Sequence, residues 1–76
     1  MAERSTLDAR GLKCPLPVLR ARKAIKPLAA GDVLVVHATD PGARPDFEAF
    51  CATTGHRLLA IREEAGVFTI EIEKVG

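Results

Sequence analysis

Aromatic residues are scarce in this chain of 76 residues, which has no Trp, no Tyr and three Phe. Proteins that bind single-stranded nucleic acid stack bases on aromatic side chains, so we expect no stacking platform and no direct binding of nucleic acid. Direct binding of tRNA by the basic residues of the first expected helix is an alternative. Two cysteines do not build the disulfide framework of a small secreted domain. No apolar run is long enough to span a bilayer, and no basic-then-apolar leader is present. We therefore expect a cytoplasmic protein that does not bind membranes.

Acidic residues are also missing from one stretch, Ala9–Gly31, which nevertheless carries six cations. The net charge of the whole chain is only +1, so this asymmetry is local. A basic block can steer an acidic protein or a phosphate backbone, but it can equally be the solvated face of a helix. On the first interpretation, we assign partner binding to four of the cations: Arg10, Lys13, Arg20 and Lys23.

The pattern of apolar and turn residues predicts a single domain, residues 1–76, with alternating strands and helices. The expected order is a strand at 6–9, a helix at about 15–29, a strand at 33–38, a helix from 45 ended by Gly55, and strands at 57–63 and 67–75. Both helices can cover one face of a four-stranded mixed sheet. We therefore predict an α/β fold of the α+β kind, a two-layer βαβαββ sandwich whose other sheet face meets water.

Helical and strand periodicities also predict which side chains form the core. Core positions in the first helix are Pro17, Ala21, Ala24, Ile25 and Leu28. Those in the second helix are Phe47, Phe50, Cys51 and Thr54. In the last strand, Phe68, Ile70 and Ile72 should point inward.

Cys14 stands immediately before Pro15, Leu16 and Pro17, where a helix is expected to begin. Pro is favoured at the first helical position, so we predict Pro15 there and Cys14 as the N-cap. Pro17 has no N–H, which leaves the Leu16 N–H to point at the sulfur. The helix dipole favours a thiolate, and so do the charges of Arg10 and Lys13. We therefore predict a Cys14 pKa moderately below that of an ordinary cysteine. The alternative is a small, unreactive cap.

The remaining thiol and imidazole groups give weaker patterns. Cys51 has the spacing of a core residue, with a resolving role for Cys14 as the alternative. Cys14, Cys51, His37 and His56 lack the short ligand spacing of local metal sites, so we predict no metal site. Neither histidine has an acidic neighbour that would complete a Cys–His catalytic pair, and no Gly-rich phosphate loop is present.

The ordered motifs resemble those of the TusA (SirA-like) family of small sulfur carriers. The resemblance begins at Leu7-Asp8-Ala9-Arg10-Gly11-Leu12-Lys13 and continues through the Cys-Pro-x-Pro sequence, residues 14–17. It extends to Gly31-Asp32, to Thr39-Asp40-Pro41-Gly42 and to Phe50–His56. Arg10 stands where an apolar residue is often found, and Leu16 stands where Glu is common. The second departure bears on the choice of partner.

The resemblance implies that Cys14 accepts a persulfide sulfur and that Pro15 and Pro17 are the motif prolines. The expected donor is a cysteine desulfurase or a rhodanese-like protein, and the sulfur passes to a downstream acceptor protein. Such relays serve tRNA thiolation, molybdenum cofactor maturation or sulfur oxidation. No cofactor is needed, and the sulfurtransferase chemistry turns over only with partner proteins. The alternative is a non-catalytic module that senses redox state or regulates a partner.

Overall fold

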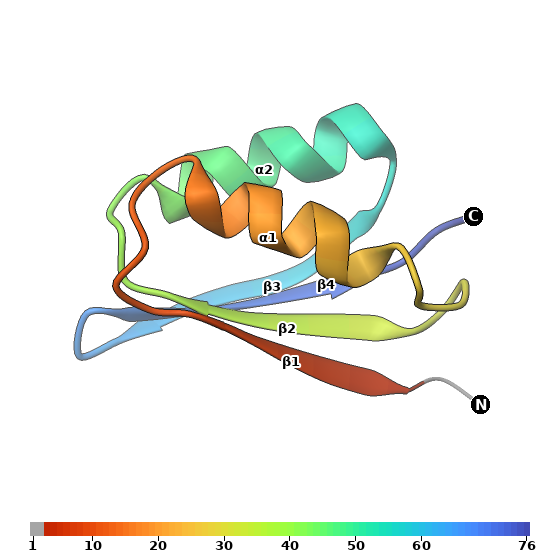
Figure 1. Cartoon of the computed structure of the whole chain (residues 1–76), viewed down its shortest axis with the longest axis horizontal. Coiled ribbons are helices and arrows are strands. Elements are labelled where there is room, and N and C mark those ends of the chain that lie inside the picture. Colours follow the sequence, from red (N-terminus) through yellow and green to blue (C-terminus); the bar gives the residue numbers. More distant parts are fainter. Residues whose placement is uncertain (1–2) are drawn as a thin grey trace.

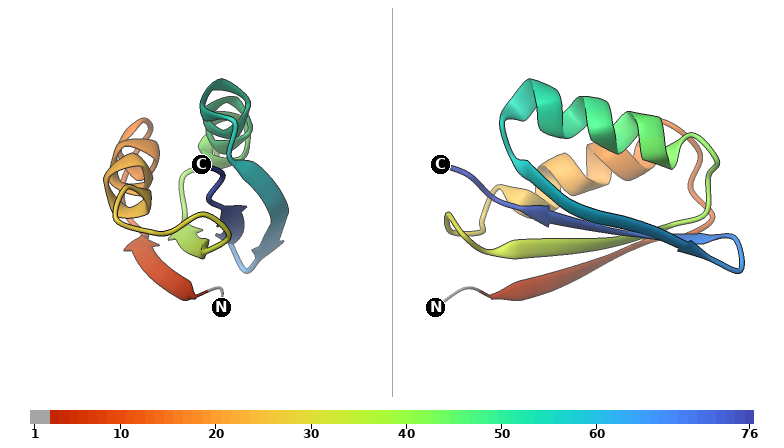
Figure 2. Two further views of the ribbon diagram at one scale, coloured as in Figure 1. Left: turned by 90° about the vertical axis from the view of Figure 1, so that its right-hand side faces the viewer. Right: turned by 180° about the vertical axis from the view of Figure 1, so that it is seen from behind.

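The computed structural model describes residues 3–76. The elements follow in the order β1 (Arg4–Ala9), α1 (Leu16–Ile25), β2 (Val33–Ala38), α2 (Ala43–Thr54), β3 (Arg57–Glu64) and β4 (Val67–Glu73). The sheet order is β1-β2-β4-β3, with β1 and β2 parallel and the other pairs antiparallel. Both helices cover the same face of this sheet (Figures 1 and 2). The predicted two-layer βαβαββ sandwich is confirmed. Within residues 3–76, no helix is long and apolar enough to cross a membrane.

Parallel pairing of β1 and β2 brings two loops together at one end of the sheet. The loop before α1 and the loop before α2 both follow the carboxyl end of a strand, and they lie side by side in Figures 1 and 2. The Gly11 N–H donates a 2.9 Å hydrogen bond to Thr39 Oγ1, which ties the two loops together. Both helices therefore begin at this end of the molecule, and the site described below lies there.

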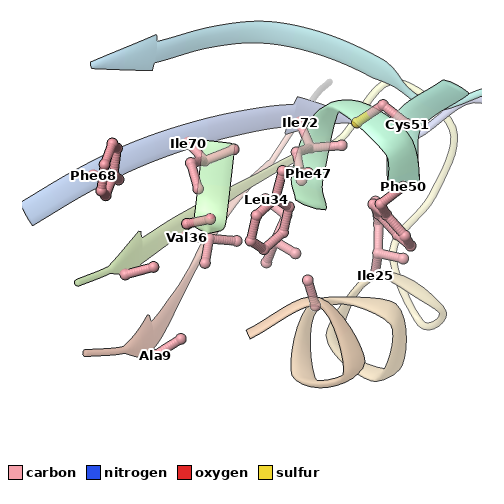
Figure 3. Close-up of a cluster of buried hydrophobic side chains, with 13 residues drawn as sticks. Ala9, Ile25, Leu34, Val36, Phe47, Phe50, Cys51, Phe68, Ile70 and Ile72 are labelled. Carbon is pink, nitrogen blue, oxygen red and sulfur yellow. The ribbon is translucent and has the colours of Figure 1, made fainter. Parts of the chain in front are cut away.

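The core lies between the helices and the sheet, as the periodicities predict. Phe68, Ile70 and Ile72 alternate inward from β4 with at most 8% of each residue exposed. They join Leu34 and Val36 of β2 and the aromatic side chains of α2 in one cluster (Figure 3). Phe47 and Phe50 meet edge to face with ring centroids 6.2 Å apart, a favourable aromatic geometry. In α1, Pro17, Ala21 and Ile25 are buried and Ala24 is half-buried, as is Leu28 beyond the end of the helix.

The face of the sheet without helices carries a network of charged side chains. Glu71 of β4 accepts hydrogen bonds from Arg4 at 3.2 Å and from Arg62 at 2.8 Å, so it links both edge strands. Glu71 pairs with Val35 of β2 across the sheet, and Val35 is only 9% exposed. The long charged side chains therefore shield apolar residues of β2 on this face.

Two helix boundaries differ from the predictions. Helix α1 ends at Ile25 instead of continuing to about Ala29, because Pro27 has no N–H to extend the helical ladder. The Lys74 ammonium donates to the carbonyls of Lys26 at 2.7 Å and Leu28 at 2.6 Å just beyond this end. Helix α2 begins at Ala43, so Pro45 lies within the first turn rather than at the start. It ends as predicted at Gly55, whose left-handed φ of 82° lets its N–H donate to Cys51 O.

Candidate functional site

Cys14 lies in a turn between β1 and α1, outside the helix. The Leu16 N–H donates to Lys13 O at 2.8 Å, and α1 starts at Leu16 with Pro17 as its second residue. The Cys14–Pro15 peptide is cis, and Pro15 rather than Cys14 is the residue that flanks the helix. The prediction that Cys14 is the N-cap is therefore wrong. The N–H that was expected to face the sulfur is bonded to Lys13.

The two cysteines occupy opposite environments. Cys14 is exposed, whereas Cys51 is 6% exposed and packs in the core from α2 (Figure 3). The prediction that Cys51 is a core residue is confirmed. Burial raises the pKa of the Cys51 thiol, which keeps it protonated and unreactive. Of the two thiols, Cys14 alone is open to a partner.

Two carboxylates approach the Cys14 thiol from the neighbouring loop and helix. The sulfur and one oxygen each from Asp40 and Asp46 all lie within 4.8 Å of one another. Asp46 comes from the first turn of α2, and Asp40 from the loop after β2. The Gly42 N–H donates to Asp40 Oδ2 at 2.9 Å and fixes this side chain. A Cβ built on Gly42 would lie 2.9 Å from that oxygen, so a larger residue would displace Asp40 beside the thiol.

The carboxylates reverse the predicted electrostatics of the thiol. The pKa of Cys14 is raised, first because Asp46 accepts a hydrogen bond from the thiol, then because of desolvation and the negative charges of Asp46 and Asp40. The prediction of a lowered pKa is therefore contradicted. The resting group at this site is therefore the thiol, which lies next to Asp46 and Asp40.

Arg10 does not act on the thiol. Its guanidinium donates to Asp8 Oδ1 at 2.9 Å and to Asp8 Oδ2 at 3.2 Å. This pair lowers the pKa of Asp8 to about 2 and raises that of Arg10. The charge that the sequence suggested for Cys14 is thus directed at another side chain.

All four predicted docking cations are exposed, and of these Arg10 is paired with Asp8. Lys13 directly precedes the thiol, and Arg20 and Lys23 lie three residues apart on α1. Arg20 and Lys23 share one exposed side of α1 with Leu16 and Leu19, which are 44% and 52% exposed. The structure therefore presents, next to Cys14, a surface of mixed basic and apolar character.

Sequence reasoning missed Asp40 and Asp46 as neighbours of the thiol. The sequence assigned Asp40 only to the Thr39-Asp40-Pro41-Gly42 motif and gave Asp46 no role. The signal that could have identified them is topological. The loops after two parallel strands meet at one sheet edge, so residues 26 or more positions after Cys14 return to it.

The histidines are used elsewhere. His56 Nδ1 accepts the Val75 N–H at 3.1 Å, which holds the segment after β4. His37 Nδ1 lies 3.4 Å from Thr69 Oγ1 across β2 and β4. Within residues 3–76, neither belongs to the group around Cys14.

Comparison with known proteins places this arrangement in context. Residues 5–74 match the protein family described as sulfurtransferase TusA. The chain is 60% identical over 68 residues to a Neisseria meningitidis protein, covering 90% of this chain and 92% of that one. It is 52% identical over 68 residues to the sulfur carrier protein TusA of Allochromatium vinosum, covering 90% of each. A crystal structure of a SirA-like protein from Desulfitobacterium hafniense superimposes with a TM-score of 0.80 at 30% identity, covering 93% of this chain and 97% of that one.

Proposed function

Since the chain belongs to the TusA family of sulfur carriers, we propose that Cys14 is the residue that accepts and relays the sulfur. The observation that carries this assignment is the contrast between the two cysteines. Cys14 is exposed in a turn at the end of the molecule where both helices begin, and Cys51 is buried in the core. A protein-to-protein transfer needs a sulfur that a second protein can reach.

The transfer follows the logic of thiol–disulfide exchange. The Cys14 thiolate attacks the terminal sulfur of a donor persulfide, R–S–SH. A new S–S bond forms on Cys14, the donor's S–S bond breaks, and the donor leaves as a thiolate. An acceptor thiolate then attacks the terminal sulfur of the Cys14 persulfide, and Cys14 leaves as a thiolate. Neither step needs an external oxidant or reductant.

The carboxylates give the free carrier a protonated resting state. Asp46 and Asp40 disfavour the thiolate form of Cys14. Because small oxidants react with the thiolate, the carrier reacts slowly with them when no partner is bound. A partner whose positive groups approach these carboxylates would increase the thiolate fraction within the complex. Reactivity is thus tied to docking. A reducing compartment such as the cytoplasm keeps the thiol free between transfers.

The exposed cations on α1 and in the turn before it fit a role in partner docking. We propose that a cysteine desulfurase or a rhodanese-like donor, and later an acceptor protein, dock against Lys13, Arg20 and Lys23. Charge reversal at these positions should slow transfer between proteins and weaken its salt dependence, with little effect on iodoacetamide alkylation of Cys14. Reversal of Arg57, an exposed cation of β3 that pairs with Glu73, is the matched comparison. Unchanged transfer from the donor in the triple variant would contradict the docking role.

Intact mass spectrometry tests the central assignment. The protein is incubated with a cysteine desulfurase, pyridoxal phosphate and cysteine, and its mass is compared before and after reduction. We expect one reducible sulfur atom on the wild-type chain and on Cys51→Ala, and none on Cys14→Ser. A chain that gains no sulfur from the desulfurase or from a rhodanese charged with thiosulfate would instead support the alternative of a regulatory module. The sulfur pathway, whether tRNA thiolation, molybdenum cofactor maturation or sulfur oxidation, depends on the acceptor.

A further inference from the structure

A groove between α1 and α2 opens next to the reactive turn. Pro15, Val18 and Arg22 line it from the α1 side, at spacings of three and four residues that place them on one side of that segment. Asp46, Ala49 and Phe50 line it from α2. The cavity has a volume of about 240 Å³, below the range of about 300–1,000 Å³ typical of small-molecule pockets. It has room for one or two protein side chains.

The two ends of the groove differ in chemistry. At one end, Pro15 is bonded to Cys14, and Asp46 lies within 4.8 Å of the thiol. Toward the other end, the Arg22 guanidinium lies over the Phe50 ring, 5.5 Å from its centroid. The ion pairs among residues 3–76 involve other arginines, so Arg22 faces the groove without a carboxylate partner. The floor between them is apolar, because Phe50 is 3% exposed and Val18 is half-buried.

We propose that this groove holds an extended segment of a partner protein, with the partner's reactive cysteine at the Cys14 end, an apolar side chain over Phe50 and a carboxylate on Arg22. The proposal rests on the proposed function, and it names the feature by which a partner is recognised. Pro15 and Arg22 are seven positions apart, which at the helical rise of 1.5 Å per residue corresponds to about 10 Å. About three residues of extended chain, at ~3.3 Å each, cover that length. The carboxylate therefore stands about three residues from the partner's cysteine.

The segment is acidic because of the charges around the groove. Arg22 offers a planar, forked donor that matches a carboxylate, and it is part of a stretch without acids from Ala9 to Gly31. Asp46 lies at the cysteine end, where the segment presents sulfur instead of a carboxylate. The groove therefore favours one placement of the segment, with sulfur next to sulfur.

Short peptides test the groove without requiring sulfur transfer. The probes are tetrapeptides that carry a cysteine activated as a mixed disulfide with an aromatic thiol, followed by leucine, alanine and glutamate, or with the order reversed. Cys14 attacks the peptide sulfur, a protein–peptide disulfide forms, and the released aromatic thiolate is measured by absorbance. A peptide with serine in place of both leucine and glutamate is the reference, and Cys14→Ser gives the background.

We expect one of the two leucine–glutamate peptides to react about tenfold faster than the serine peptide, which corresponds to about 1.4 kcal/mol. Ala49→Phe fills the groove and should abolish this preference. Ala52→Phe, on an exposed position of α2 outside the groove, should retain it. Arg22→Gln should remove only the contribution of glutamate. Lys26→Gln, which removes an exposed cation outside the groove, should leave that contribution unchanged.

Equal rates for all peptides, or a preference that survives Ala49→Phe, would overturn the proposal. Thermal unfolding of each variant shows that the fold is retained. The persulfide-loading experiment is independent of these rates. A chain that loads sulfur but shows no peptide preference refutes the groove alone, and a chain that never loads sulfur refutes the proposed function.

Discussion

Replacement of each cysteine by serine should have opposite effects on sulfur loading and on stability. We expect Cys14→Ser to lose sulfur loading and to keep its stability, because an exposed residue is replaced by one of similar size. We expect Cys51→Ser to keep sulfur loading and to lose stability. The residue is 6% exposed in the cluster that includes Phe47 and Ile72, where a hydroxyl has apolar neighbours.

The size of the stability loss can be bounded. A buried hydroxyl without a partner costs about 1–3 kcal/mol, and a bond to the carbonyl four residues earlier in α2 would reduce this cost. A domain of 76 residues has a free energy of unfolding of about 4–11 kcal/mol. The lowest stability combined with the largest cost leaves a free energy of unfolding of about 1 kcal/mol, which corresponds to roughly five folded molecules for each unfolded one. Loss of loading in Cys51→Ser could therefore not be attributed to unfolding.

The assay follows labelled sulfur from cysteine, through a desulfurase, onto the chain, in parallel with thermal unfolding. The unfolding midpoint of Cys51→Ser should fall by roughly 5–20 °C, and that of Cys14→Ser should change little. Cys51→Ala, which adds no polar group, separates the hydroxyl effect from the loss of packing. Full labelling of Cys14→Ser would refute the reasoning, and so would an unfolding midpoint for Cys51→Ser equal to that of the wild type.

Three further predictions concern the charges of the fold. Asp46→Asn should lower the pKa of Cys14, so that iodoacetamide alkylation becomes faster near neutral pH. Glu48→Gln, which changes an exposed residue of the same helix, should leave the pH dependence of the alkylation rate unchanged. Asp32 has a lowered pKa because it accepts two backbone N–H groups, so its stabilising effect should be complete above its unfolded value of about 3.9 and should disappear as pH falls through the folded pKa. The wild type should accordingly lose its stability advantage over Asp32→Asn in acid, as measured by urea midpoints; an advantage independent of pH would contradict this. Lys74→Met removes both ammonium hydrogen bonds after α1 and should cost about 1–2 kcal/mol in urea unfolding, whereas an unchanged midpoint would show that water replaces them.

Most of the fold was accessible from local patterns. The strand at 33–38 has the predicted bounds, and the alternation of Phe68, Ile70 and Ile72 gives the inward face of β4. These predictions succeed because period and burial are linked directly in regular elements. The start of α1 was wrong by one residue, and that small error was enough to move Cys14 from the cap position into the preceding turn.

The site was predicted only in part, because its electrostatics depend on residues distant in sequence. The position of Cys14 as the accessible thiol follows from its own neighbours. The sign of its pKa shift depends on Asp46, which is 32 positions later and reaches the thiol only after β1 and β2 pair in parallel. Arg10 is a different case, because its partner Asp8 is only two positions away and the pairing could have been anticipated from the sequence.

The raised pKa of Cys14 changes the kind of reactivity that the site supports. A thiol with a strongly lowered pKa is ionised in the free protein, but its intrinsic nucleophilicity is correspondingly lower. A thiol held next to Asp46 and Asp40 is mostly protonated in the free protein and, once ionised, is the stronger nucleophile. Under the proposed function, the carboxylates protect the unloaded thiol from small oxidants, and a partner that neutralises them increases the thiolate fraction within the complex. The reactivity of Cys14 would then depend on docking.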